Sequence, residues 1–557
     1  MPTPSNADVA HTLDRYATLL DIAGGNVFKI RAYRRAAEGV RALAEPLAAV
    51  RADGRLAAID GVGAGIAAAL DELIDHATFQ PWSDLQRELP ASVLDLLNLP
   101  GIGAKTAGRL FRDHGIADLP GLESALAAGR LRGVPGIGGK TEAALVAGLA
   151  ALKRRTGRSR LGIALPAGRR LADAIRDALP GSPVSLAGST RRWEETVGDL
   201  NLIVGSAFPE RALSAIAGLT QASTVTDRTA QSVRLKLHGG GPEAHVLIVT
   251  PAAFGTALVR ATGTAAHLAL LPAVLPEASS EEEVYARLGL PWIPPELRQG
   301  ADEITRGIAG DIDRLITAAD VQGEFHAHTI WSDGSASIAE MAAAAAGVGY
   351  RFLGISDHSG GLGVANGLTT DRLITQRGEI EAVGATGPVR LFAAAEVEVG
   401  RDGALDFNDA TLAGLDLAIA SLHSGLRQPR ATFTDRLIAT LEHPGIDIVA
   451  HPSGRLIEQR EGADVDWDRA FATAARTGTA LEINANPARL DLNAALARRA
   501  ADAGCLLTIN CDAHHPEGFA VMEYGIAVAR RAWLRPDQVL NCWALDRVEA
   551  WLAARGR

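Results

Sequence analysis

The sequence has little cysteine, no long apolar run and no excess of positive charge, and each shortage excludes a class of protein. Its three cysteines among 557 residues all lie near the C-terminus, at Cys505, Cys511 and Cys542, and no two form a CxxC pair. This usage excludes a disulfide framework and fits a reducing compartment, so a cytoplasmic location is expected. No apolar run approaches the roughly 20 residues of a membrane span, and the polar N-terminus lacks the apolar core of a signal peptide. We therefore expect no association with a membrane.

The charge of the chain is unfavourable for binding DNA as a whole. The formal net charge is −10 at pH 7, but residues 1–160 are nearly neutral, with 20 Lys and Arg against 17 Asp and Glu. An acidic surface repels the phosphate backbone, so contact with nucleic acid must come from local motifs. The length predicts roughly three or four domains.

Three Gly-x-Gly turns, each followed by a stretch of helical character, recur in the first 160 residues. One has the sequence GVG, and two share the sequence PGIG. Glycines let the backbone approach a phosphate, and the N–H groups at a helix start receive its charge. The alternative is an ordinary helix-helix turn, but the repeated PGIG form resembles helix-hairpin-helix modules, which implies non-specific contact with the DNA backbone. The glycines of the two PGIG turns and the lysines beside them are Gly101, Gly103, Lys105, Gly136, Gly138 and Lys140.

Histidines and carboxylates are scattered over the last 240 or so residues, and most follow a short apolar run such as FLGI, LAIASL or LLTIN. The runs predict buried parallel strands separated by Ala-rich helices. In a (β/α) barrel the C-terminal strand ends converge on one face, so these side chains would meet there. A single histidine of this kind is more often a packed core residue. Together, nitrogen and oxygen ligands without a thiolate predict a site for Mn²⁺, Zn²⁺ or Fe²⁺. The residues are His326, His328, Asp333, His358, Glu396, His423, His451, Asp512 and His514.

These motifs resemble those of a known domain. HAHTIWSDG, ISDHS, SLHSG, AHPSGR and CDAHH resemble the successive motifs of the polymerase and histidinol phosphatase (PHP) domain. LEINANPARLDL and MEYG resemble, more narrowly, the PHP domain that ends bacterial family X DNA polymerases. The resemblance covers essentially the whole chain.

The resemblance implies three divalent metal ions. One would be held by His326, His328, Glu396 and Asp512. Glu396 would bridge to a second ion, bound also by His423 and His451. The third would be held by Asp333, His358 and His514.

Two arginines follow strand-end motifs, Arg455 in HPSGR and Arg489 in NPARLDL. A guanidinium can donate two hydrogen bonds to one phosphate, so both are candidates for binding the scissile phosphate during catalysis. The alternative interpretation is a surface salt bridge.

The stretch SLAGSTRRWEETVGDLNLIV resembles a nucleotidyltransferase palm, which implies that Gly188, Ser189 and Arg192 hold a triphosphate. In that family three Asp residues hold two Mg²⁺ for phosphoryl transfer. Here Asp199 is present, but the other two positions are Asn201 and His245. Neither is a good ligand for so hard a cation.

The region after the palm resembles a thumb but looks shortened, since FGTALVRATGTAAHLALL runs almost directly into SSEEEVYARLGLPWIPPELR. We predict that the palm keeps its fold, binds Mg²⁺ poorly and deoxynucleotide only weakly, and has lost polymerisation.

The predicted fold is multidomain, α+β and α/β. It comprises a helical domain with a helix-hairpin-helix motif (1–82), a fingers-like helical domain with two such motifs (83–158), a degenerate nucleotidyltransferase-like palm (159–250), a shortened thumb-like region (251–315) and a distorted (β/α)7 PHP barrel (320–557). A monomer is expected.

The favoured function is a DNA-binding, metal-dependent phosphoesterase of the 3′→5′ exonuclease type, acting in DNA repair or end processing. Three alternatives remain open: a non-catalytic scaffold that binds DNA ends, an active gap-filling polymerase, and a small-molecule phosphatase such as a histidinol phosphatase. The helix-hairpin-helix turns argue against the last of these, since a small substrate needs no DNA scaffold.

Overall fold

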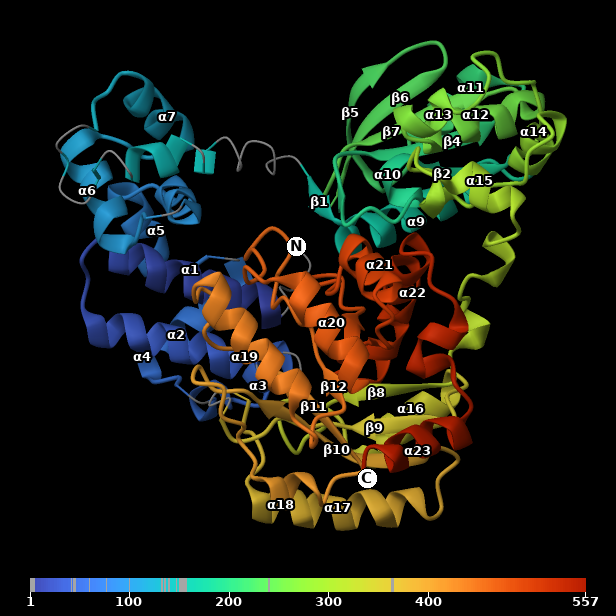
Figure 1. The fold of residues 1–557 in the computed structure, drawn as a ribbon. Coiled ribbons are helices and arrows are strands. Elements are labelled where there is room, and N and C mark those ends of the chain that lie inside the picture. Colours follow the sequence, from blue (N-terminus) through green and yellow to red (C-terminus); the bar gives the residue numbers. More distant parts are fainter. Residues whose placement is uncertain are drawn as a thin grey trace. The chain divides into compact units, whose positions relative to one another are not determined.

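The computed structural model divides into two compact units, Met1–Gly157 and Arg158–Arg557, each with its own hydrophobic core (Figure 1). The structure describes residues 6–41, 43, 47–59, 61–76, 78–99, 101–131, 134, 137, 138, 141–146, 148, 149, 158–238, 241–361 and 365–556. Within these ranges no helix is both long and apolar enough to cross a membrane.

The first unit is helical, as predicted. Apolar side chains at helical spacing, such as Leu13, Ala17 and Val40, are fully buried in its core. Its helices include α1 (Asn6–Ile22), α2 (Val27–Arg41), α3 (Leu47–Ala52), α4 (Ala64–His76), α5 (Gln80–Glu88), α6 (Ala104–His114) and α7 (Leu119–Ala127).

The Gly-x-Gly turns share one arrangement. The middle residues Val62, Ile102 and Ile137 are buried at 4–7% exposure, which anchors each turn in the core. Gly101 has φ +84°, a conformation that favours glycine, and α6 begins directly after Gly103. Gly103, Gly138 and Lys105 are exposed, so the backbone of these turns faces outward. The predicted contacts Gly136 and Lys140 lie outside the described residues.

The second unit starts with a five-stranded mixed sheet in the order β2-β4-β7-β6-β5, in which β4 and β7 are parallel. Helices α9 and α11 cover one face, and α12 packs on the other through Leu258 against Ile203. The strands are β2 (Val184–Ala187), β4 (Leu200–Gly205), β5 (Ala222–Arg228), β6 (Ser232–Leu237) and β7 (Ala244–Val249), with β1 (Ser159–Arg160) and β3 (Thr196–Val197) as a separate pair; the helices are α9 (Leu161–Ala178), α10 (Gly188–Arg191) and α11 (Pro209–Ala217).

Short helices with a small core of their own follow the sheet. A buried ion pair joins them to it: Glu281 accepts hydrogen bonds from Arg191 after β2 and from the fully buried Arg298. The helices are α12 (Phe254–Thr262), α13 (Ala265–Ala269), α14 (Glu281–Arg287) and α15 (Glu303–Ile308).

The rest of this unit is a barrel of seven parallel strands, as predicted. The order runs from β8 to β14 without interruption, and a bridge between Ala327 and Ala513 joins the first strand to the end of the last. The strands are β8 (Gly323–Ala327), β9 (Phe352–Ile355), β10 (Arg390–Glu398), β11 (Leu417–Ser421), β12 (Ile448–Val449), β13 (Ala480–Asn484) and β14 (Leu507–Asn510).

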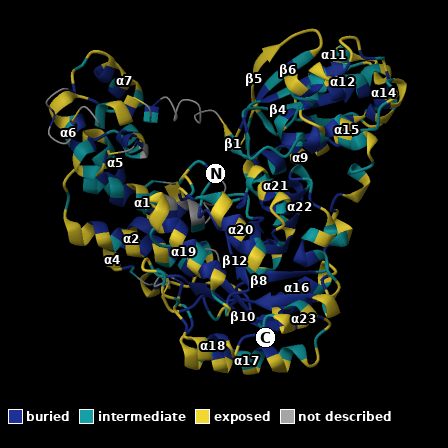
Figure 2. Ribbon diagram, viewed as in Figure 1, coloured by how far each residue is buried: buried dark blue, intermediate teal, exposed yellow. Residues whose placement is uncertain are grey.

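Helices surround the barrel strands, which are buried almost throughout (Figure 2). Strands buried on both sides read as continuous apolar runs, which explains why the sequence signalled them. The helices are α16 (Ile338–Gly347), α17 (Thr370–Gly384), α18 (Asp409–Leu412), α19 (Arg430–Glu442), α20 (Trp467–Thr477), α21 (Ala494–Asp502), α22 (Met522–Arg531) and α23 (Leu545–Ala554).

One apolar cluster draws on six of the barrel strands and on α23. It includes Phe325, Phe392 and Ile419, packed with Val548 of α23. Side chains alternate along a strand, so Ala394 of this cluster and Glu396 share a face of β10. The polar residues therefore lie beyond an apolar floor, near the C-terminal ends of the strands.

Candidate metal centre and the residual palm

The fold brings all nine predicted ligands into three groups. Within each group the candidate ligand atoms all lie within 4.8 Å of one another. The groups are His326, His328 and Asp512; Glu396, His423 and His451; and His328, Asp333, His358 and His514.

Glu396, at the end of β10, stands between the groups. Its Oε1 lies 3.1 Å from His451 Nε2 and 3.5 Å from His423 Nε2. Its Oε2 lies 3.3 Å from His326 Nε2 and 2.8 Å from His358 Nδ1. The two oxygens of one carboxylate thus face different groups, as a bridging ligand requires.

The third group depends on a loop after β8. Asp333 Oδ1 lies 3.4 Å from His514 Nε2, and its Oδ2 lies 3.5 Å from His358 Nε2. The next residue, Gly334, packs so tightly that a Cβ there would lie 2.6 Å from the carbonyl carbon and oxygen of His328. Glycine at this position is what allows the loop to return to the site.

His328 belongs to two of the groups, because its Nε2 lies 3.2 Å from Asp512 Oδ1 and its Nδ1 lies 3.8 Å from Asp333 Oδ1. A neutral imidazole has one lone pair for a ligand bond. The shorter contact of Nε2 matches the grouping of His328 with His326 and Asp512.

Buried carboxylates orient the imidazoles from behind. Glu482 Oε1 lies 2.8 Å from Nδ1 of His326, and Glu398 Oε2 lies 2.7 Å from Nδ1 of His423. When Nδ1–H donates to a carboxylate, Nε2 is left as the free acceptor facing the site.

The donor set fits divalent metal ions. Nε2 of His326 and both ring nitrogens of His328 are buried without a hydrogen-bond partner. Leaving such groups unsatisfied costs free energy, and an ion would satisfy them. The centre is therefore compatible with metal binding through imidazole and carboxylate ligands.

Neighbouring histidines and carboxylates shift one another's pKa values in this centre. Burial lowers the pKa of His358, but the neighbouring carboxylates Glu396 and Asp333 outweigh it and raise that pKa to about 10. Burial raises the pKa of Asp512, but His326 and His328 hold it well below its usual range. Protons therefore compete with metal ions for this site.

The predicted polymerase residues also come together, along one row across the palm sheet. Asn201 on β4 pairs in register with Ala187 and with His245, and His245 pairs with Arg234 on β6. The Nδ2 of Asn201 donates to Asp199 Oδ1 at 2.9 Å. Asp199 is thus hydrogen-bonded to Asn201, which the resemblance puts at the position of the second acid.

His245 in this row has a lowered pKa. Burial and the nearby Arg234 lower this pKa, although the carboxylates of Asp199, Asp227 and Glu243 oppose them. Arg192, a predicted triphosphate contact, donates to the carbonyl of Thr262 at 2.7 Å. The guanidinium of Arg192 is thus partly engaged within the protein.

Comparison with known proteins identifies the family. The chain is 34% identical over 568 residues to the DNA polymerase/3′-5′ exonuclease PolX of Bacillus subtilis, covering 98% of this chain and 99% of that protein. The chain belongs to the family X DNA polymerases. Residues 4–79 match a helix-hairpin-helix domain, residues 93–151 a SAM-like helix-hairpin-helix tandem, and residues 257–299 the DNA polymerase beta thumb. These domains imply DNA binding.

The C-terminal region of this family X chain has relatives of its own. It is 28% identical over 244 residues to a probable phosphatase of Edwardsiella ictaluri, covering 95% of that protein. It is 25% identical over 237 residues to a probable phosphatase of Syntrophotalea carbinolica, covering 90% of that protein. The resemblance to a polymerase joined to a PHP-type domain is therefore confirmed.

The two predicted catalytic arginines differ in their surroundings. Arg489 Nε lies 3.9 Å from Asp512 Oδ2, and Nη1 of Arg489 is buried without a partner. Arg455 instead makes two hydrogen bonds to Glu195, of 3.0 and 2.6 Å. This arrangement fits the alternative of a salt bridge better than a phosphate contact.

A carboxylate outside the predicted ligand set supports the centre. Asp357, in ISDHS, belongs to none of the three groups. It accepts hydrogen bonds from the backbone N and the Oγ1 of Thr329, and from Gln376 of α17. It thereby fixes the loop between His328 and Asp333. The sequence signal was a carboxylate after a buried strand, which does not distinguish a ligand from its support.

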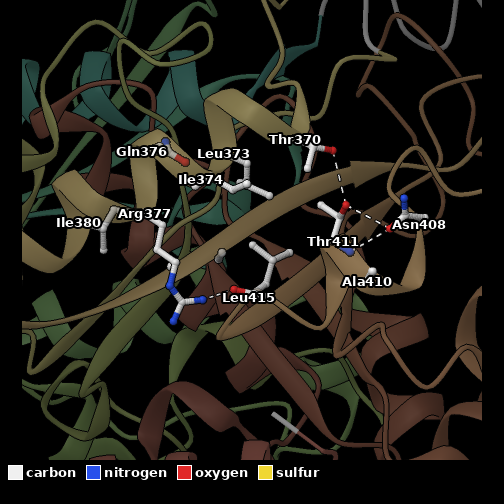
Figure 3. A pocket seen from close by; sticks show the side chains of 13 residues that line it. Thr370, Leu373, Ile374, Gln376, Arg377, Ile380, Asn408, Ala410, Thr411 and Leu415 are labelled. Carbon is white, nitrogen blue, oxygen red and sulfur yellow. Dashed lines mark hydrogen bonds between the residues drawn. The ribbon is translucent and has the colours of Figure 1, made fainter.

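A cavity of about 460 Å³ between α17, β10 and α18 lies apart from the ligands (Figure 3). Its lining is largely apolar and includes Leu373, Ile374 and Leu415. The Oγ1 atoms of Thr370 and Thr411, which also line it, lie 3.4 Å apart. None of the nine candidate ligands lines it. We assign no part of the chemistry to this cavity.

Proposed function

We propose that residues 320–557 form a metal-dependent phosphoesterase that removes nucleotides from DNA in the 3′→5′ direction. The observation that carries this proposal is the arrangement of nine ligands in three groups, with Glu396 shared between groups. Three ions of Mn²⁺, Zn²⁺ or Fe²⁺ would occupy the groups as the resemblance implies. When bound, they would supply Lewis acidity for activating water and neutralising phosphate charge.

The side chains of the protein would prepare this chemistry. Glu482 and Glu398 hold two imidazoles in the tautomer that binds metal. Arg489, beside Asp512, adds positive charge where a phosphate would approach. The outward-facing turns at Gly101 and Gly138 would hold the DNA backbone, which distinguishes this proposal from a small-molecule phosphatase.

The relatives support the same proposal from two sides. The Bacillus subtilis relative that spans the whole chain is named for both polymerase and 3′-5′ exonuclease activity, and the relatives of the C-terminal region are named probable phosphatases. A scaffold that only binds DNA ends would not require three complete ligand groups. We infer that the activity serves DNA repair or end processing.

The direct test uses the full chain, purified without chelator and supplied with Mn²⁺. With a single-stranded oligonucleotide labelled at its 5′ end, we expect a ladder of products that shorten from the 3′ end, with released mononucleotides. Chelation of the metal should stop the reaction. Release of phosphate from small monoesters without any shortening of the oligonucleotide would instead favour the small-molecule phosphatase.

We also propose that the palm no longer polymerises. Primer extension is expected to be at least about 1,000-fold slower than for a palm with three acids, since each lost acid removes a ligand for ions that stabilise the transition state by several kcal/mol. The measurement is extension of a labelled primer with Mg²⁺ or Mn²⁺.

Two variants make this prediction specific. Restoring Asn201→Asp together with His245→Asp is expected to give at most partial activity, because Arg234 still lies beside the site. Rapid extension by the unmodified protein that disappears in Asp199→Ala would show that the palm is active after all.

A further inference from the structure

The palm and the barrel meet at a loop that runs close to the candidate metal centre. Both belong to the unit Arg158–Arg557. Glu195, just before β3 of the palm, receives two hydrogen bonds from Arg455 of the barrel, of 3.0 Å to Oε2 and 2.6 Å to Oε1. The pair is half-buried, with side-chain exposures of 15% for Arg455 and 35% for Glu195. Such a two-point pair is among the stronger hydrogen-bonded contacts in proteins.

Arg455 ends a tight turn that begins at the candidate ligand His451. The N–H of Gly454 donates to the carbonyl of His451 at 2.8 Å, and the N–H of Arg455 donates to Ser453 Oγ at 3.3 Å. The guanidinium also donates to the carbonyl of Leu490, next to Arg489. One side chain therefore ties the palm to two loops at the metal centre.

His451 needs support of this kind. Its φ is +28°, a strained conformation for a residue with a side chain, which persists only where the surroundings fix it. Its N–H donates to Glu482 Oε2 at 2.7 Å on one side. On the other side, the turn that ends at Arg455 provides the restraint, and His451 Nε2 then lies 3.1 Å from Glu396 Oε1.

The palm side of the contact is itself well fixed. The carbonyl of Glu195 accepts a hydrogen bond of 3.0 Å from the N–H of Leu161 at the start of α9. The preceding residue, Glu194, is bound by Arg531 at 2.9 Å and by Gln299 at 3.0 Å. The loop that carries Glu195 is therefore held in place by hydrogen bonds on both sides of this residue.

We propose that Glu195 and Arg455 are positioning residues, through which the palm sets the geometry of the metal group formed by Glu396, His423 and His451. The palm would then serve the barrel although two of its three acids are replaced. This inference rests on the proposed phosphoesterase function and assigns Arg455 a role other than phosphate binding. Glu195 itself neither binds a metal ion nor transfers a proton in this proposal.

The test compares Glu195→Gln, Arg455→Ala and the double variant in the full chain. Metal binding is measured by calorimetric titration of the metal-free protein with Mn²⁺. Loss of a residue that orients a metal ligand typically weakens metal binding or activity about 10-fold or more. We expect one of the bound ions to bind about 10-fold more weakly in each single variant, and the double variant to be no worse than either. The exchanged pair Glu195→Arg with Arg455→Glu should recover part of the loss.

Kinetics then separate positioning from substrate contact. Glu195→Gln is expected to lower kcat about 10-fold with KM within about twofold. If Arg455 instead bound the scissile phosphate, Arg455→Ala would raise KM. Glu195→Gln would then leave turnover unimpaired, because it only frees the guanidinium of Arg455. That pair of results would overturn the proposal. The titration measures Mn²⁺ binding and needs no turnover. An inactive wild-type protein would therefore refute the proposed function, while the metal affinities of the variants would still test this inference.

A matched control breaks a different contact between palm and barrel. Arg169 of α9 binds Glu523 of α22 through two hydrogen bonds of 2.7 and 2.8 Å, and neither residue adjoins a candidate ligand. Glu523→Gln is expected to leave metal affinity and kcat unchanged. Equal losses in Glu523→Gln and Glu195→Gln would mean that any loosening of the interface is enough, and the specific role of Glu195 would be rejected.

Discussion

Replacing His326 and His328 together with alanine is expected to reduce shortening of a labelled single-stranded oligonucleotide by at least about 1,000-fold, equivalent to about 4 kcal/mol of transition-state stabilisation. Both side chains are fully buried, and both approach Asp512 and Glu396. Their removal takes two nitrogen ligands from one group and leaves Asp512 as its remaining member. The rate is measured with Mn²⁺ at saturating oligonucleotide, and bound metal is counted by elemental analysis.

A histidine in the same barrel provides the control. His443 follows α19 and approaches only Asp409, at 3.4 Å, among the carboxylates of the described residues. His443→Ala is therefore expected to keep both the metal content and the rate. A double variant that degrades the oligonucleotide as fast as the unmodified protein would show that the activity belongs to another site or to a contaminant.

Removing residues 1–157 is expected to weaken binding of long DNA by about 100-fold or more while leaving hydrolysis of a small phosphodiester within about twofold. The reason is electrostatic, since each lost phosphate contact reduces the slope of log affinity against log salt by about 0.9. The two units have separate hydrophobic cores, so the remaining chain keeps its own core intact. The measurement is DNA affinity at several salt concentrations, together with turnover of bis-p-nitrophenyl phosphate.

A point variant in the full chain checks that the loss comes from the turns. Lys105→Glu reverses a charge on an exposed residue at the start of α6. It should lower both DNA affinity and the salt slope without changing hydrolysis of the small ester. If long DNA is bound equally well without the first unit, the DNA site lies elsewhere in the chain, and the helix-hairpin-helix turns are structural connections.

Much of the metal centre could be predicted from the sequence because parallel strands impose a simple rule. Each strand is buried on both faces, so it reads as an apolar run, and the residue after it lies at the same end of the barrel as the others. His358 after β9 and Asp512 after β14 are 154 positions apart along the chain, yet the rule places them together. Asn201 and His245 were identified from the resemblance to a nucleotidyltransferase palm, and the structure pairs them in register on β4 and β7.

Contacts between distant segments were decided only by the tertiary structure. Nothing in the motif HPSGR indicates that Arg455 binds Glu195, which lies 260 positions earlier in another fold element. The same holds for Glu482, whose place inside the barrel directs Nδ1 of His326 away from the site. Local sequence determines which residues stand at strand ends, because the length of an apolar run and the polar residue that follows it can be read from neighbouring positions. Which partner satisfies each buried charge depends on packing across the whole unit, because a charge can be paired only with what the fold brings within a few ångströms.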